Sequence, residues 1–176
     1  IAQGSPRLLG HGLASEATST KVAFRAGDIL YGKLRPNLKK SVEAPFDGVC
    51  STEILALRAS AGIDRRFLLY LTHWPPFQEF AVSTASGTKM PRTSWASLRD
   101  FETPLPPLFE QRKIASILSS IDETIRRTEA VASHVREVKK GLMQELLTRG
   151  LPGRHKRFKK TEVGEIPDDW AVVTIA

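Results

Sequence analysis

The sequence predicts an α+β fold in which a small mixed domain is followed by a long helix of the coiled-coil type. Residues 21–103 consist of short apolar segments separated by Gly, Pro and Asp turns, a pattern typical of strands and short helices. From Ile114 to Val135, mostly apolar residues recur at alternating steps of four and three, which is the heptad spacing of a helix that pairs with another helix. After Val135 the register slips, but Val138, Leu142 and Leu146 continue one apolar stripe. A proline cluster at Pro104, Pro106 and Pro107 separates the two patterns.

Composition limits the classes of protein to consider. The 176 residues are 41% apolar, enough for one ordinary core, and no apolar run reaches the roughly 20 residues that a membrane helix needs. The start lacks the basic region and continuous apolar run of a signal peptide. The single cysteine, Cys50, excludes an internal disulfide and fits a reducing cytoplasm, and with four scattered histidines it predicts no zinc site.

Charge and the chain ends add two expectations. The net charge of +7 favours a polyanionic partner, because Lys and Arg displace counterions from phosphates. The sequence opens at Ile1 instead of Met and stops within an apolar run at Ile175 and Ala176, so it is expected to be a fragment of a longer protein.

Residues 21–58 are expected to form strands joined by turns. Turn chemistry occurs at Ala26-Gly27-Asp28 and again at residues 44–48. The expected strands contain Val22 with Phe24, then Ile29-Leu30-Tyr31, then the alternating residues from Thr52 to Arg58.

Residues 64–83 are expected to be helical, because Asp64 can cap a helix that carries Phe67, Leu68 and Leu71. Pro75-Pro76 interrupts the helix, and helical spacing resumes with Phe77, Phe80 and Ala81. A polar loop over residues 83–92, a short turn over 94–98 and a strand over 101–103 complete the predicted small domain.

The first candidate site is a cluster of cations after Gly27. Lys33 and Arg35, two residues apart on an expected strand, would share one face, and Lys39 and Lys40 follow in the next loop. Such a cluster suits contact with DNA phosphates or base edges. The alternative, a solvated strand edge protected by lysines, explains the same charges and stays open.

The second candidate site is the loop Ser86–Arg92, Ser-Gly-Thr-Lys-Met-Pro-Arg. Its small residues allow close backbone approach, and Thr88, Lys89 and Arg92 offer hydrogen-bond donors. The loop is expected either to contact DNA or to be an ordinary connection between helices.

The long helix is expected to run from Leu108 to Arg149, ending at Gly150, Pro152 and Gly153. About 40 helical residues would span roughly 60 Å. A core helix is the commoner fate of an amphipathic segment, but this length favours an arm whose partner is a second helix, from the missing sequence or from another copy. The expected pairing residues are Ile114, Leu118, Ile121, Ile125, Val135, Leu142 and Leu146.

The C-terminal part begins with five cations and no acid between Arg154 and Lys160. This run could contact the DNA backbone or serve as a flexible basic linker. Gly164–Pro167 is expected to form a turn, and Trp170–Ile175 a strand.

No catalytic constellation is found in the sequence. Trp74-Pro75-Pro76-Phe77 is similar to the Asn/Asp-Pro-Pro-aromatic motif of adenine methyltransferases, but that motif needs a side-chain carbonyl, and Trp74 offers only a donor. The only Glu-x-Lys sequence, Glu137-Val138-Lys139, lies in the middle of the long helix and not on a strand, where it could hold magnesium. We therefore predict a non-enzymatic protein without catalytic residues, metal or cofactor.

Several short segments, in this order and spacing, resemble the specificity subunit of type I restriction-modification systems. The block from Pro104 to Ala115, with Pro-Pro-Leu-Phe-Glu-Gln leading into the helix, is the most specific of them. The others are Gly27-Asp28-Ile29-Leu30, Leu34-Arg35-Pro36, Cys50-Ser51-Thr52-Glu53-Ile54, Gly87-Thr88 and the segment Gly164–Trp170.

This resemblance implies a division of the chain into four parts. Residues 1–106 would be the C-terminal part of a target recognition domain, 107–150 a helical spacer arm, 151–160 a basic linker, and 161–176 the start of a second, truncated recognition domain. In this family two spacers pair antiparallel and hold two recognition domains apart. Each recognition domain reads one half of a split DNA site.

The resemblance also implies partners and a location. The expected partners are double-stranded DNA, methyltransferase (M) subunits and restriction (R) subunits, and these subunits carry all the methylation, nuclease and ATP chemistry. The expected role is cytoplasmic defence against foreign DNA without a cofactor in this chain. The sequence leaves open two alternatives, the recognition segment of a fused methyltransferase-restriction enzyme and a coiled-coil interaction module.

Overall fold

The computed structural model describes residues 1–13 and 19–174. The chain divides into two units, Ile1–Ser120 and Ile121–Ala176, and the long helix contributes residues to both. Each unit is described by itself. Within the described residues, no helix is long and apolar enough to cross a membrane.

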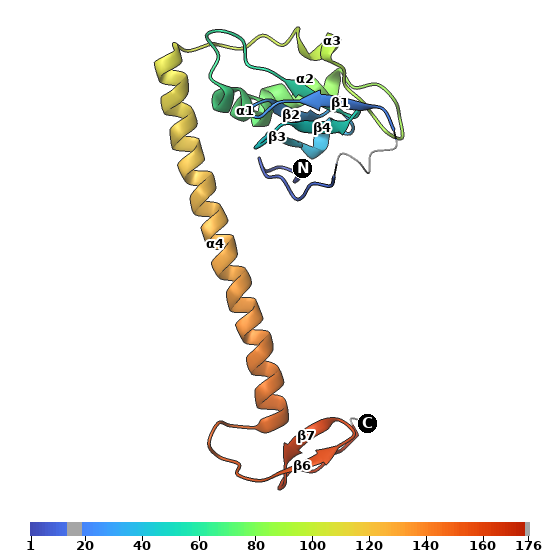
Figure 1. The fold of residues 1–176 in the computed structure, drawn as a ribbon, viewed down its shortest axis with the longest axis vertical. Coiled ribbons are helices and arrows are strands. Elements are labelled where there is room, and N and C mark those ends of the chain that lie inside the picture. Colours follow the sequence, from blue (N-terminus) through green and yellow to red (C-terminus); the bar gives the residue numbers. More distant parts are fainter. Residues whose placement is uncertain (14–18, 175–176) are drawn as a thin grey trace. The chain divides into compact units, whose positions relative to one another are not determined.

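The first unit contains two small antiparallel sheets (Figure 1). One sheet pairs β1 (Lys21–Phe24) with β4 (Gly48–Ser51). The other has the strand order β3-β2-β5, formed by Ser41–Glu43, Ile29–Gly32 and Ile54–Leu57. The strands expected from the apolar runs over residues 21–58 are therefore present.

The central strand β2 builds two cores because neighbouring side chains of a strand point to opposite faces. Leu30 packs on one side and Tyr31, which is fully buried, on the other. The Leu30 cluster contains Phe24, Val42 and Ala44, and the Tyr31 cluster contains Phe77, Ala81 and Leu98.

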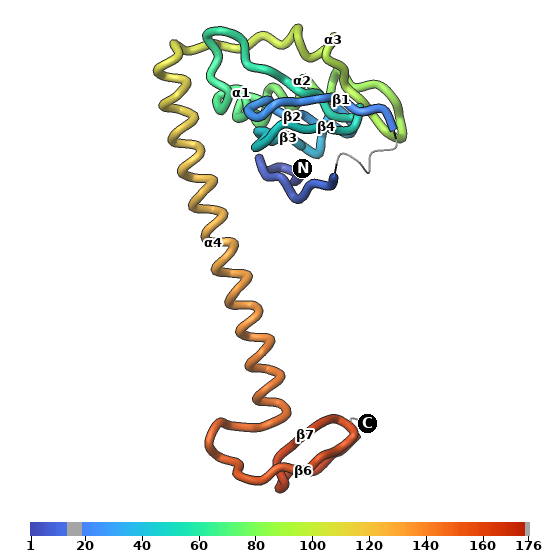
Figure 2. Tube along the Cα trace, in the orientation of Figure 1, coloured from blue at the N-terminus to red at the C-terminus, as the bar shows by residue number. Residues whose placement is uncertain are grey.

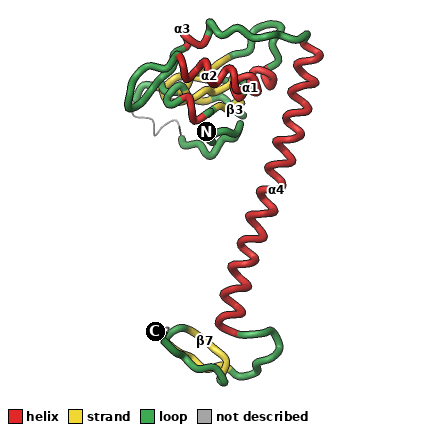
Figure 3. Tube along the Cα trace, turned by 180° about the vertical axis from the view of Figure 1, so that it is seen from behind, coloured by secondary structure: helices red, strands yellow, loops and turns green. Residues whose placement is uncertain are grey.

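Two helices cover the Tyr31 face of the sheet, as the view from behind shows (Figure 3). These are α1 (Arg65–His73) and α2 (Pro75–Ser83), which the short helix α3 (Trp95–Leu98) follows. The predicted cap of α1 is confirmed, because the Asp64 carboxylate accepts hydrogen bonds from the backbone N–H groups of Arg66 and Phe67. Pro75 begins α2, a position where the missing N–H costs nothing.

The strand predicted over residues 101–103 is not formed. Phe101 instead packs its ring against Phe77, with ring centroids 5.2 Å apart, and also lies near Trp74 and Phe80. The apolar residue that suggested a strand is therefore part of the helix-side core, where it needs no strand partner.

Helix α4 runs from Leu108 to Arg149 as one helix of 42 residues, so the predicted bounds are confirmed. At 1.5 Å per residue it is about 63 Å long, and the chain trace follows it without a break (Figure 2). Gln111 and Ala115, in its first turns, are buried in the first unit.

The second unit combines the later turns of α4 with a hairpin of β6 (Phe158–Thr161) and β7 (Gly164–Pro167). Two predictions were wrong here: Gly164–Pro167 is a strand instead of a turn, and the strand predicted over Trp170–Ile175 is not formed in its described part, which ends at Thr174, while Ile175 lies outside the described residues. Lys159 and Lys160, placed in a basic linker by the sequence, pair with Ile166 and Glu165. Trp170 packs edge-on against His155 at 5.8 Å between ring centroids, so its apolar surface is used without strand pairing.

Candidate nucleic-acid interface

The two basic segments predicted from the sequence lie directly against each other. The backbone N–H of Arg35 donates to the carbonyl oxygen of Pro91 at 2.8 Å, and the backbone N–H of Thr93 donates to the backbone carbonyl oxygen of Lys33 at 3.1 Å. Between these bonds, Leu34 and Arg92 form an antiparallel bridge. The fold therefore joins the Lys33–Arg35 segment to the loop Ser86–Arg92.

The strand argument for Lys33 and Arg35 was wrong. Strand β2 ends at Gly32, and Arg35 has a left-handed backbone with φ 51°, which is uncommon for a residue other than glycine. The chain turns there into the 3₁₀ helix Pro36–Leu38, so the alternation of a strand does not set the direction of the two side chains. Their proximity to the loop depends on the backbone pairing with residues 91–93.

The loop Ser86–Arg92 is closed at its base. Ser86 and Arg92 exchange backbone hydrogen bonds, both at 2.9 Å. Gly87 has φ 98°, which side chains rarely adopt, and a Cβ there would lie 3.4 Å from the Met90 carbonyl oxygen. Thr88, Lys89 and Met90 are exposed at the tip.

The cations of these two segments differ in whether they have a partner within the protein. Arg92 donates from Nε to Glu53 Oε2 at 2.9 Å and from Nη1 to the Met90 carbonyl oxygen at 3.1 Å. For Lys33, Arg35 and Lys89, no side-chain hydrogen bond or ion pair is found within the described part of the chain. Their charges are therefore available to an external anion.

Lys39 and Lys40 have different surroundings. The stem of Lys40 lies over Gly32, where an added Cβ would be 3.2 Å from the Lys40 Cβ. Lys39 has φ 49° and lines a shallow hollow beside α2 with Glu79 and Val82. The structure records no backbone pairing of these two lysines with the loop Ser86–Arg92.

The predicted pairing residues of α4 fall into two groups. Ile114 and Leu118 line a hollow of about 250 Å³ with α1 side chains, including Phe67 and Tyr70. The remaining five are between 38% and 59% exposed. These five are Ile121, Ile125, Val135, Leu142 and Leu146. The first two members therefore face the first unit, and the exposed five form an apolar seam.

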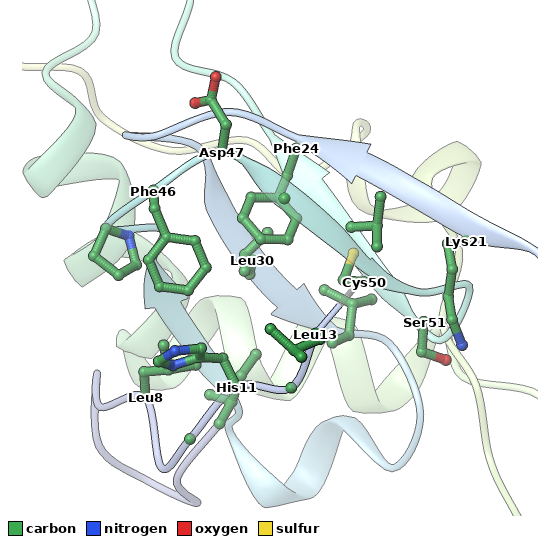
Figure 4. Close-up of a pocket in the computed structure, with 17 residues that line it drawn as sticks. Leu8, His11, Leu13, Lys21, Phe24, Leu30, Phe46, Asp47, Cys50 and Ser51 are labelled. Atoms are coloured by element: carbon green, nitrogen blue, oxygen red, sulfur yellow. The ribbon is translucent and has the colours of Figure 1, made fainter. Parts of the chain in front are cut away.

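A separate pocket of about 510 Å³ lies between the N-terminal segment and strands β1 and β4. Its lining is largely apolar, with Phe24, Phe46 and His11 around it (Figure 4). Burial raises the pKa of the Cys50 thiol in this pocket, and a thiol that resists ionisation is a poor nucleophile. Cys50 is therefore poorly suited to act as a nucleophile in this pocket.

Comparison with known proteins identifies the family. Residues 17–135 match the model of the type I restriction modification DNA specificity domain. The chain belongs to this family. The predicted resemblance and the α+β fold class are therefore confirmed.

Similar specificity subunits are found in archaea and bacteria. The type I restriction enzyme MjaVIII specificity subunit of Methanocaldococcus jannaschii is 34% identical over 151 residues, which cover 85% of this chain and 32% of that protein. The EcoDI specificity subunit of Escherichia coli is 31% identical over 128 residues, which cover 73% of this chain and 26% of that protein. The specificity-domain chain thus spans about a third or less of these relatives' length.

Solved structures agree with this assignment. The HsdS subunit from Thermoanaerobacter tengcongensis matches with a TM-score of 0.56 at 27% identity, over 81% of this chain and 39% of that one. A chain from a structure that addresses complex assembly and conformational transition of the type I R-M system matches with a TM-score of 0.62 at 24% identity, which shows the shared fold.

Sequence reasoning missed the role of Gln111 in this specificity domain. The side chain is 1% exposed and makes hydrogen bonds to Asp64, Gly62 and Pro106. It therefore fastens the first turn of α4 to the loop that begins α1. In the sequence, Glu110-Gln111 served only as a marker of the family. The signal that could have revealed the role of Gln111 is its position, since it is a polar residue on the buried side of a helix.

Proposed function

We propose that this chain takes part in sequence-specific DNA recognition as a portion of a type I specificity subunit. The observation that carries the proposal is the backbone pairing of Lys33–Arg35 with the loop Ser86–Arg92, which places cations that have no partner among the described residues beside an exposed loop tip. Phosphate contacts position a protein on DNA, and side chains at such a tip can reach base edges.

The DNA-contacting residues in this proposal come from both segments and the neighbouring lysines. They are Lys33, Arg35, Lys39, Lys40, Thr88 and Lys89, whereas the sequence-based candidate Arg92 is held by Glu53 within the protein. The net charge of +7 and the names of the related specificity subunits support the assignment. The chain would act without catalysing a reaction itself, in the cytoplasm.

The exposed seam of α4 supports a second part of the proposal. An apolar stripe that remains exposed over residues 121–146 fits a spacer arm that pairs with another helix, from the same protein or from a second copy. In this scheme residues 1–106 belong to one recognition domain, 107–150 to the arm, 151–160 to a basic connection whose last three residues lie in β6, and 161–176 to the start of another domain. Methyltransferase and restriction subunits would assemble on the whole protein.

DNA binding by the 176-residue chain tests the proposal. We expect weak binding of duplex DNA, with little sequence preference and an affinity that falls linearly with salt on logarithmic axes. Reversing Lys33 and Arg35 to Glu should lower affinity about tenfold or more and reduce the salt slope by roughly 1 to 2.

The matched control reverses Arg136 and Lys140 to Glu on α4, where both residues are exposed and lie off the apolar seam. It changes the net charge by the same amount, so equal weakening by both double variants would show that binding follows total charge alone. Fluorescence anisotropy with a labelled duplex measures both quantities, and circular dichroism checks that each variant is folded.

A further inference from the structure

Arg92 connects three segments of the first unit. Its backbone closes the loop with Ser86, and it forms a bridge opposite Leu34. Its guanidinium donates to Glu53 Oε2 at 2.9 Å and to the Met90 carbonyl oxygen at 3.1 Å. The Arg92 backbone therefore closes the base of the loop, and its side chain links the loop tip to the turn before β5.

Glu53 is the second half of this arrangement. Its backbone carbonyl oxygen accepts a hydrogen bond from the N–H of Lys33 at 3.0 Å, while its carboxylate holds Arg92. The Glu53 and Arg92 side chains are 34% and 45% exposed, so the pair is neither buried nor fully solvated. Glu53 thus fixes both the cationic segment and the loop that pairs with it.

The Glu53 carboxylate also decides what Arg92 can bind. A phosphate that approached the Arg92 guanidinium would meet the negative charge of Glu53 and would have to displace existing hydrogen bonds. Lys33, Arg35 and Lys89 carry no such internal partner within the described residues. The two paired segments therefore contain one cation bound within the protein, Arg92, and three cations that have no partner among the described residues.

We propose that Glu53 and Arg92 are positioning residues, which hold the loop Ser86–Arg92 against Lys33–Arg35, and that the Arg92 guanidinium stays on Glu53 when DNA is bound. Only the part of this inference that concerns bound DNA rests on the proposed function. It refines the sequence-based assignment of Arg92, which treated all cations of the loop as equivalent contacts.

Amide hydrogen exchange tests the positioning role without DNA. Glu53→Gln and Arg92→Gln should each speed exchange at the Arg35, Ser86 and Thr93 amides about two- to fivefold, the range expected for a partly exposed ion pair. The charge exchange Glu53→Arg with Arg92→Glu should restore the original rates to within about twofold, because the pair can re-form with reversed polarity. Glu123→Gln, which breaks an exposed Glu–Arg pair on α4, is the control and should leave these amides unchanged.

The double variant Glu53→Arg with Arg92→Glu also tests whether Arg92 contacts DNA, because this variant has the same net charge as the original chain. A positioning pair predicts a salt slope of DNA binding equal to that of the original chain, together with affinity recovered relative to Arg92→Gln. A slope lower by roughly 0.9 in the exchanged variant would mean a lost phosphate contact and would overturn the inference. So would unchanged amide exchange in both single variants. If the original chain binds no DNA, the proposed function fails, while the exchange rates still decide whether Glu53 and Arg92 hold the loop.

Discussion

The side-chain amide oxygen of Gln111 accepts a hydrogen bond from the backbone N–H of Asp64 at 2.9 Å. Asp64 caps α1 with its carboxylate, and Gln111 lies in the first turn of α4. The Gln111 amide nitrogen donates to the carbonyl oxygens of Gly62 and Pro106. One buried amide thus fixes where the long helix begins relative to the helix that covers the sheet.

Replacing Gln111 by Ala should destabilise the first unit by about 2–4 kcal/mol. The substitution removes three hydrogen bonds made by a buried side chain to half-buried or exposed residues, and each such bond contributes roughly 0.5–1.5 kcal/mol. Urea unfolding followed by circular dichroism measures the change. Gln144→Ala, at an exposed position of α4, is the control, and an equal, small effect of both variants would contradict the role of Gln111.

Acidification should weaken the fold through Asp28. The Arg58 guanidinium, which donates at 2.9 Å and 2.8 Å, holds the pKa of this buried carboxyl below its usual 3.8, aided by the Arg25 backbone N–H. A depressed pKa in the folded state stabilises the protein above pH 3.8, and this stabilisation is lost as the pH falls through the folded-state pKa.

Asp28→Asn provides the corresponding test. At neutral pH it should cost about 1–2 kcal/mol, a modest value because Arg58 is largely exposed and solvent screens its charge. The difference in stability between the variant and the original chain should shrink when both are unfolded in urea at progressively lower pH below 4. A difference that stays constant with pH would argue against the Asp28–Arg58 pair as the source.

The exposed seam of α4 should mediate self-association of the 176-residue chain, because a second copy is the available partner in a pure sample. Ile125→Glu with Val135→Glu should shift the dimer dissociation constant upward by about two orders of magnitude, since each change introduces a charge into an apolar seam. Analytical ultracentrifugation over a range of concentrations measures the shift.

Ala130→Glu tests whether charge on any exposed position of α4 has the same effect. Ala130 is exposed and lies off the heptad positions, so this variant should associate like the original chain. A chain that is monomeric at all accessible concentrations would contradict pairing between copies.

The end of α4 depends on Gly150. Its φ is 73°, and an added Cβ would lie 2.7 Å from the His155 ring and 3.1 Å from Trp170. Gly150→Ala should therefore displace the His155–Trp170 contact and shift the Trp170 indole N–H signal in NMR spectra. Gly153 has a similar φ of 75° but nothing within 4 Å of the added Cβ, so Gly153→Ala isolates the backbone cost. Equal shifts in both variants would show that the close contact at Gly150 is unimportant.

Local sequence patterns were sufficient for much of the fold. The proline cluster before Leu108, the heptad steps from Ile114 and the glycines and proline after Arg149 gave the bounds of α4, because helix periodicity and helix stops are properties of neighbouring residues. The Asp64 cap was predictable for the same reason. The candidate basic residues were visible as charges, although their grouping was argued from a strand that ends before Lys33.

The sequence by itself thus determined the long amphipathic helix, three of the five strands within residues 21–58, the helices over residues 65–83, and the membership in the specificity family. Only the tertiary structure brought Lys33–Arg35 against the loop Ser86–Arg92, assigned Arg92 to Glu53, and gave Gln111 three partners across the helix junction. The physical reason is that these links join residues far apart in the chain through backbone hydrogen bonds and single side-chain contacts. Neither kind of interaction leaves a period or a composition that can be recognised along the sequence.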